Sequence, residues 1–547
     1  MGFGNSIRRS LASLSAVVMI ATFAACGNSG QQTTSTAANA AKQTISAFGS
    51  EPADLLTTNV GGTESSKVLG LLYSGLTAFN AKGQVVNEVA DSIKANDDST
   101  KYTITLKDGW KFTDGTPVTA QSFTKAWSYG ANVTNAQLCA SYFSDIKGYD
   151  ELQTKGVDAN AQLSGLTVVN DHEFTVELNA PSSVFPVKIG YIPFAPQPES
   201  FFSDPKSFKE NPIGNGAYKL KQWTHSQSIA LEPNPDYKGN FPAKNGGVTF
   251  QLYTDAQAAY ADVEAGNLDI LENVPASASK LFQTDTKLQA FNEGGAAFAT
   301  FAIPGRLAHF SGKEGQLRRQ ALSYAVNRDA LTTKILNGLG TPATDFVAPA
   351  IPGHSNDLKG KSVLTYDPDK AKQLWAEADA ISPWEGTFKI AYNADSATKK
   401  AIFEAVLNSI KNTLGIDTAT NPIPTAQEFG SLVNGRTIDT PFSMSWAPDY
   451  PSIENYLQPL YSTAAAKTGL NQGDYSNAQV DDLLSKAAKE SNTDKAQSYY
   501  QQAEEILLEE LPVIPLYYQN ATAVAAKGVS GVELGWQGLP VYQNITK

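Results

Sequence analysis

Strand-like and helix-like hydrophobic patterns alternate along this chain, and that alternation limits the possible folds more than any other feature. The segment Lys101–Leu106 (KYTITL) alternates apolar and polar residues, as a half-buried strand requires. Thr119 can then cap a helix. From Glu314 to Leu331, apolar residues recur at the i, i+4, i+7 and i+8 spacing of an amphipathic helix. The chain is therefore predicted to fold as a mixed α/β protein.

Two later segments extend the pattern. Residues 401–415 (AIFEAVLNSIKNTLG) carry one apolar stripe and end at Gly415, which suits a helix C-cap. Residues 502–518 (QAEEILLEELPVIPLYY) change from a helical pattern to a short apolar strand. Because proline cannot donate a ladder hydrogen bond, Pro512 and Pro515 predict an edge or crossover position for that strand.

The N-terminus has the pattern of an export signal. Arg8 and Arg9 precede an apolar run, Leu11–Ala25, that is too short to span a membrane. Cys26 follows small residues at the end of this run, which resembles a bacterial lipobox. That resemblance predicts a signal peptide over residues 1–25, lipidation of Cys26, a flexible tether over 26–42, and anchoring at the extracytoplasmic face of the cell membrane. An ordinary secretory signal with an incidental cysteine is the alternative.

Charge and cysteine content exclude several classes. Loss of the two signal arginines would change the net charge from −12 to −14, and no basic run is present, so nucleic acid is not an expected partner. The pairs Arg318-Arg319 and Lys399-Lys400 are predicted to lie on solvated helix faces. With Cys26 lipidated, Cys139 has no partner for an intramolecular disulfide, so burial alone must stabilise the fold.

The sequence lacks the clusters that catalysis needs. Its four histidines are scattered without a metal-binding pair, and there is neither a Gly-x-Ser-x-Gly elbow nor a phosphate loop. We therefore expect no catalytic residue, no metal and no cofactor, with an exported hydrolase as the less favoured class.

Seven segments, in order, resemble the oligopeptide- and dipeptide-binding family of ABC-importer solute receptors. They are LLYSGLT (71–77), LKDGWKFTDGTPVTAQSF (106–123), NPIGNGAYKLKQW (211–223), EPNPDYKG (232–239), LRRQALSYAVNRDAL (317–331), SWAPDYPSIENYL (445–457) and LPVIPLYY (511–518). The resemblance implies a monomer that takes a short peptide and docks on the permease subunits of an ABC importer. It also implies that the same clamp can instead bind an oligosaccharide, haem or a nickel chelate.

The implied fold is a two-lobed α/β clamp of the periplasmic-binding-protein type II, with an extra domain inserted in the first lobe. The expected ranges are 43–79, 187–293 and 513–547 for lobe I, 80–186 for the inserted domain and 294–512 for lobe II. Strands near Ala299–Ile303 and Val513–Leu516 are expected to cross between the lobes.

A receptor for many peptides must bind what all peptides share, namely the backbone amides and the charged ends. The resemblance places Asp449 where it would pair with the peptide ammonium, and Trp446 beside it as a cleft wall. The adjoining Ser445, Ala447 and Tyr450 complete this candidate segment.

The opposite side of the expected site is the glycine-containing loop Asn59–Glu64, with Gly62 and Thr63 as candidate backbone contacts. Two questions stay open. Asp449 could merely form a turn before Pro451, with Trp446 in the core. The group that receives a peptide carboxylate is also undecided among three arginines: Arg306, Arg318 and Arg436.

Overall fold

The structure is a computed structural model that describes residues 43–467 and 469–547. The predicted signal peptide, the lipidation site Cys26 and the tether over 26–42 lie outside the described residues.

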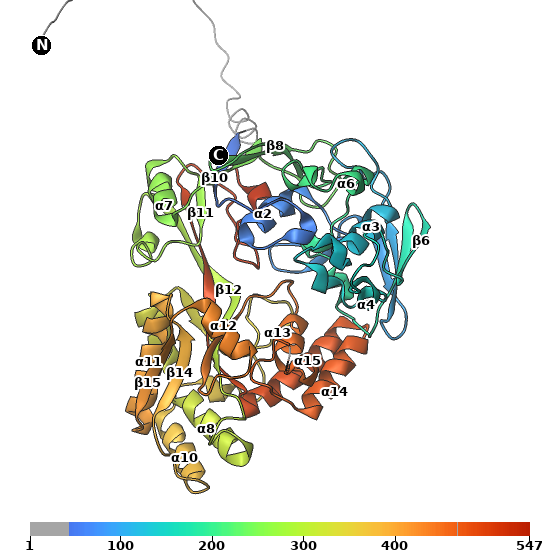
Figure 1. Ribbon diagram of the computed structural model, residues 1–547. Coiled ribbons are helices and arrows are strands. Elements are labelled where there is room, and N and C mark those ends of the chain that lie inside the picture. The colour runs from blue at the N-terminus through green and yellow to red at the C-terminus, as the bar shows by residue number, and fades with distance from the viewer. Residues whose placement is uncertain (1–42, 468) are drawn as a thin grey trace, which may run out of the picture.

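One long mixed sheet runs through both halves of the molecule (Figure 1). Its strands follow the spatial order β15, β14, β16, β12, β17, β11, β1, β10, β9, β8, with β13 paired to β17. Their bounds in that order are Thr418–Ile423, Phe388–Asn393, Phe442–Trp446, Leu288–Ala302, Val513–Ala526, Ile270–Glu272, Thr44–Gly49, Gly247–Leu252, Ser228–Pro233 and Tyr218–Thr224, with β13 at Gly340–Pro342. One continuous hydrogen-bonded sheet therefore joins the two lobes.

Lobe I is the half that contains β1 and β8–β11. β1 pairs in parallel with both β10 and β11, which joins the start of the described chain to segments some 200 residues later. The helices α2 (Thr63–Leu72) and α7 (Ala256–Ala265) pack on this part of the sheet. Its buried core includes Ile45, Leu69 and Phe250.

A separate four-stranded antiparallel sheet lies beside lobe I (Figure 1). Its order is β4 (Ala90–Ala95), β5 (Lys101–Leu106), β7 (Glu173–Glu177) and β6 (Leu166–Asn170). The predicted strand at Lys101–Leu106 is confirmed, with its even-numbered residues buried. The helix predicted after Thr119 is also confirmed as α3 (Ala120–Ala131), which starts with a reciprocal capping box between Thr119 and Ser122. This sheet and α3 fall within the expected inserted domain, residues 80–186, have their own hydrophobic core and are called the inserted module below.

Lobe II contains β14–β16 and most of the helices. These are α8 (Gly312–Ala325), α9 (Arg328–Ala330), α10 (Pro368–Asp379), α11 (Ala397–Leu414), α12 (Ala426–Asn434), α13 (Glu454–Tyr461), α14 (Ala478–Lys489) and α15 (Thr493–Glu510). Gly415 caps α11 in the left-handed conformation, as predicted. The predicted amphipathic helix ends at Ala325 rather than at Leu331, and a π-helical turn follows α9.

The prediction that Arg318-Arg319 lies on a solvated face is wrong. Arg318 is fully buried, and its guanidinium forms ion pairs of 3.0 Å with Glu314 and with Asp379. The same group lies 4.5 Å from the centre of the Trp375 ring. A buried guanidinium needs partners of this kind because an unpaired charge in the interior is costly.

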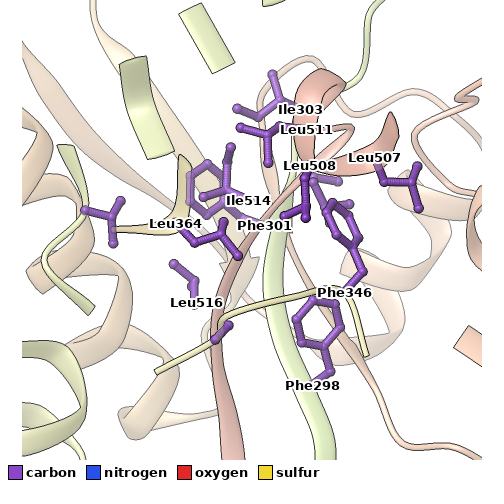
Figure 2. Close-up of a cluster of buried hydrophobic side chains, with 14 of the residues drawn as sticks. Phe298, Phe301, Ile303, Phe346, Leu364, Leu507, Leu508, Leu511, Ile514 and Leu516 are labelled. Carbon is purple, nitrogen blue, oxygen red and sulfur yellow. The ribbon is translucent and has the colours of Figure 1, made fainter. Parts of the chain in front are cut away.

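β12 and β17 run antiparallel from one lobe into the other and form the connection between them (Figure 1). Their pairing is interrupted between Gly294 and Phe298. A second irregularity lies between Ala299 and Thr300, whose partners Tyr517 and Pro515 are two positions apart. Figure 2 shows the hydrophobic cluster where the two strands enter lobe II, with Phe298 and Phe301 from β12 beside Ile514 and Leu516 from β17.

The remaining elements are short. They include β2 (Thr77–Phe79), β3 (Val85–Asn87), α4 (Tyr149–Leu152), α5 (Phe185–Lys188) and α6 (Glu199–Ser203). Within residues 43–467 and 469–547, no helix has the length and apolar character needed to cross a bilayer.

Candidate ligand-binding site

Asp449 lies in the loop after β16, where lobe II faces the inserted module. Its backbone N–H donates to Asn455 Oδ1 at 2.9 Å, and its carboxylate accepts a 2.8 Å hydrogen bond from the Tyr142 hydroxyl. Burial raises the pKa of Asp449, although hydrogen bonds from Tyr142 and Asn455 and the charge of Lys188 act in the opposite direction. Lys188 itself is paired 2.5 Å away with Asp145. In the described chain, Asp449 is therefore a half-buried carboxylate without an ion-pair partner.

Two tyrosines stand beside this carboxylate. Tyr142 belongs to the 3₁₀ turn Ala140–Phe143, and its ring meets that of Tyr191 edge-on with centroids 5.0 Å apart. Burial raises the pKa of both phenols, and the charge of Asp449 raises each further. Both hydroxyls therefore stay neutral and can donate to a carboxylate. Neither tyrosine was predicted, since Tyr142 lies 307 positions from Asp449 in the sequence.

One edge of β16 is open next to Asp449. On one side the strand pairs with β12 along its whole length, from Phe442 opposite Ala302 to Trp446 opposite Phe298. On the other side β14 pairs only at Phe442, so no described strand adjoins residues 443–446 there. The exposed Ser445 lies on this stretch. Such an edge offers unpaired backbone groups that an extended peptide can pair with.

The loop Asn59–Glu64 lies across from Asp449. Gly62 is the N-cap of α2 and Thr63 its first residue, and both are at least partly exposed. The Cys139 thiol donates to the Val60 carbonyl at 3.5 Å. Burial raises the pKa of Cys139 to about 11, and the charge of Asp449 contributes to that rise. The segment 139–142 thus contacts the loop through Cys139 and Asp449 through Tyr142, which places the loop and Asp449 in the same region.

The other predicted residues differ in their surroundings. Tyr450 is buried, and its hydroxyl donates to Glu454 Oε2 at 2.7 Å, whereas Ala447 is exposed. Among the arginines considered for a carboxylate, Arg306 and Arg436 both pair with Asp474, and Arg318 is buried in its own ion pairs. All three guanidinium groups are thus already bound to carboxylates of the protein.

Two cavities adjoin this region, each of about 270 Å³. The first extends from Asp449 and Tyr191 into lobe I, toward Tyr73 and Trp536. The second lies in lobe II, where residues 443–446 of β16 face Phe403 of α11 and Tyr517 of β17. Across residues 43–467 and 469–547, no group of three or more His, Cys, Asp or Glu side chains is arranged to hold a metal ion.

Comparison with known proteins defines the class. Residues 84–468 match the model of the bacterial extracellular solute-binding proteins, family 5. The chain is 26% identical over 502 residues to the oligopeptide-binding protein OppA of Bacillus subtilis, covering 88% of each sequence. It is 28% identical over 488 residues to the periplasmic murein peptide-binding protein MppA of Escherichia coli, covering 87% of each.

Solved structures agree with the sequence relatives. The unliganded open form of MppA, a periplasmic murein tripeptide-binding protein, superposes with a TM-score of 0.82 at 25% identity, over 92% of this chain and 97% of that one. AppA of Bacillus subtilis in complex with a nonapeptide has the same fold, with a TM-score of 0.66 at 22% identity over 92% and 98% of the two chains. The fold is thus the two-lobed clamp of solute-binding proteins. The chain belongs to family 5 of the bacterial extracellular solute-binding proteins.

Proposed function

We propose that this protein is an extracytoplasmic receptor that captures short peptides between its lobes and delivers them to an ABC importer, without catalysing a reaction. The observation that carries the proposal is Asp449, a carboxylate that has no cationic partner among the described residues and lies at the end of the open edge of β16. A peptide matches both features, because its ammonium group can pair with the carboxylate and its backbone can pair with the open strand edge.

The Asp449 carboxylate and the open edge of β16 together define the expected binding mode. The peptide extends along residues 443–447 of lobe II and is covered by the loop Asn59–Glu64 of lobe I. Its ammonium group pairs with Asp449, while Tyr142 and Tyr191 form an aromatic wall around that end. Pro448 lacks an N–H, so at that position the backbone can only accept a hydrogen bond. Main-chain bonds give affinity without reading the side chains.

The relatives support this assignment, since OppA and MppA are named for peptide binding. The higher TM-score with the open, unliganded MppA than with peptide-bound AppA supports an open state of the clamp here. The lobe and inserted-domain ranges given above remain our proposal, with β12 and β17 as the hinge. We also propose that the protein acts as a monomer held at the membrane through lipidated Cys26.

The test is a thermodynamic cycle on Asp449. Asp449→Asn keeps the size of the side chain but removes the charge that faces the ammonium. Loss of one partner of a desolvated charge pair costs about 2–5 kcal/mol, so free-amine peptides should bind roughly thirtyfold more weakly or worse. Peptides acetylated at the amino end should lose much less, and calorimetry on the four combinations measures the coupling.

Asp439→Asn is the matched control, because Asp439 is an exposed carboxylate ten positions earlier. It should leave both peptide types unaffected. Equal weakening of free and acetylated peptides by Asp449→Asn would make Asp449 a structural residue and remove the main support for a peptide ligand.

A further inference from the structure

Lobe II encloses two acidic side chains that peptide binding does not use. Asp345 lies in the segment after β13, and Glu504 lies on α15. Asp345 is 1% exposed and Glu504 is fully buried. Aspartate and glutamate are almost never buried to this degree unless they are paired, so the two residues need a structural explanation.

As anions, the two carboxyl groups lack the partners that a buried charge needs. One oxygen of Asp345 accepts from the Phe346 N–H at 2.6 Å. The other oxygen of Asp345 and both oxygens of Glu504 are buried and receive no hydrogen bond from the described residues. Among those residues, the only basic side chain within 4.0 Å of either carboxyl is His354, whose Nδ1 lies 3.6 Å from Asp345 Oδ2. Burial lowers the pKa of His354, so it is neutral at neutral pH and supplies no counter-charge.

The other titratable groups that face the pair are phenols. Tyr461 of α13 and Tyr518 of β17 lie close enough to Asp345 and Glu504 for the two carboxylate charges, together with burial, to raise the pKa of both phenols. Tyr500 lies one helical turn before Glu504 on α15, and burial raises its pKa too. These phenols stay neutral and cannot compensate a negative charge.

A shared proton satisfies the arrangement. Burial raises the pKa of Asp345 to about 7 and raises that of Glu504 well above its ordinary range, and the charge of Asp345 raises the Glu504 pKa further. With one proton between them, the Glu504 carboxyl donates to Asp345. Asp345 then carries the charge, because it also accepts from Phe346. Two adjacent carboxyls in a low-dielectric interior favour this singly protonated state.

The pair is connected to the strands that cross between the lobes. The Tyr518 hydroxyl of β17 donates to the Asp345 carbonyl at 2.9 Å. The next residue, Phe346, packs against Phe298 of β12 with ring centroids 6.4 Å apart (Figure 2). A second charge forced into the pair would therefore act on the segment that contacts both crossing strands where they enter lobe II.

We propose that Asp345 and Glu504 form a proton-dependent switch, which holds a shared proton at neutral pH and loosens the packing around β12 and β17 when that proton is lost. The inference goes beyond the proposed function and does not depend on the ligand. Because both carboxyls bind protons more tightly in the folded than in the unfolded chain, the pair favours folding most below about pH 4. This contribution is lost as pH rises through the raised pKa values.

Chemical denaturation from pH 6 to 9 compares wild type with Glu504→Gln. The glutamine amide can donate to Asp345 without titrating, so it reproduces the protonated glutamate. Each extra proton held by the folded wild type lowers its folding equilibrium constant by up to about tenfold per pH unit. The ratio of folding constants, variant over wild type, should therefore rise at least about tenfold between pH 6 and 9.

Glu509→Gln is the matched control, because Glu509 is an exposed carboxylate five positions later on α15. Its ratio to wild type should stay constant over the same range. Asp345→Asn removes the other member of the pair and should show the same rise as Glu504→Gln, so it provides the test if Glu504→Gln does not fold.

Hydrogen exchange on the full chain, corrected for the intrinsic effect of pH on exchange, locates the change. Residues 343–346 and 513–518 should lose protection at pH 9 in wild type and keep it in Glu504→Gln. A ratio that stays constant from pH 6 to 9 for Glu504→Gln and Asp345→Asn would overturn the switch. A rising ratio without loss of protection in these segments would overturn its connection to the crossing strands. Both results leave the peptide proposal standing.

Discussion

At the scale of single residues, the ionisation of Asp449 should control affinity. Burial raises its pKa above the ordinary value of about 3.9, and only the ionised form can pair with an ammonium. As pH falls through the raised pKa, the carboxylate is protonated, and affinity for free-amine peptides should drop by up to tenfold per pH unit. Above it, affinity should stay level until the peptide ammonium loses its proton near about pH 8.

Calorimetry from pH 4 to 8 measures this profile. Asp449→Asn should abolish the loss of affinity at low pH. This result would distinguish Asp449 from other titrating groups such as Asp345, whose pKa is raised to about 7 by burial. If the affinity of Asp449→Asn still fell at low pH as in wild type, another group would control binding.

The sequence singles out Asp449 and Trp446 because both lie in one short, recognisable segment, and their role in ligand binding stays a prediction. Tyr142 could not be predicted, since its contact with Asp449 depends on how the inserted module meets lobe II. The Lys399-Lys400 pair was predicted to lie on a solvated helix face. That is right for the exposed Lys400 but wrong for Lys399, which is half-buried and lines a cavity beside β16.

At the scale of elements, the crossing of β12 and β17 should depend on one glycine. A side chain at Gly295 would clash with the carbonyl oxygen of Gln519 on β17, whereas Gly294 has open space around its missing Cβ. Gly295→Ala should therefore force the strands apart and cost about 1–3 kcal/mol of unfolding free energy. Gly294→Ala should be neutral or slightly stabilising, because it reduces the entropy of the unfolded chain.

Chemical denaturation of the two variants makes the comparison directly. Equal stability of Gly295→Ala and Gly294→Ala would contradict the close packing at the crossing.

Local patterns predicted β5, α3 and α11 well because each is decided by its own apolar spacing and caps. The local patterns predicted the length and position of β17 less well. The prolines indicated a short edge or crossover strand, and the strand does cross, but it is 14 residues long and central in the sheet. Pro515 is tolerated there because the pairing with β12 is irregular at that point.

At the scale of the whole molecule, the two lobes have distinct hydrophobic cores and are joined by two strands. The Ser183 N–H donates to the Ala488 carbonyl at 2.8 Å, and Tyr142 reaches Asp449, so the inserted module already contacts lobe II. The lobe architecture could be anticipated only from the resemblance of whole segments, because strands of lobe I such as β1 and β10 are far apart in sequence.

Small-angle scattering with parallel thermal melts, in the presence and absence of a short-peptide library, tests whether peptides close the clamp. A ligand that binds between the lobes shifts the population toward the closed form. The radius of gyration should therefore decrease with peptides, and at a concentration of about 100 Kd the folded state should gain about 2.7 kcal/mol. An oligosaccharide library should have neither effect. An unchanged radius and melting temperature with peptides would contradict the account.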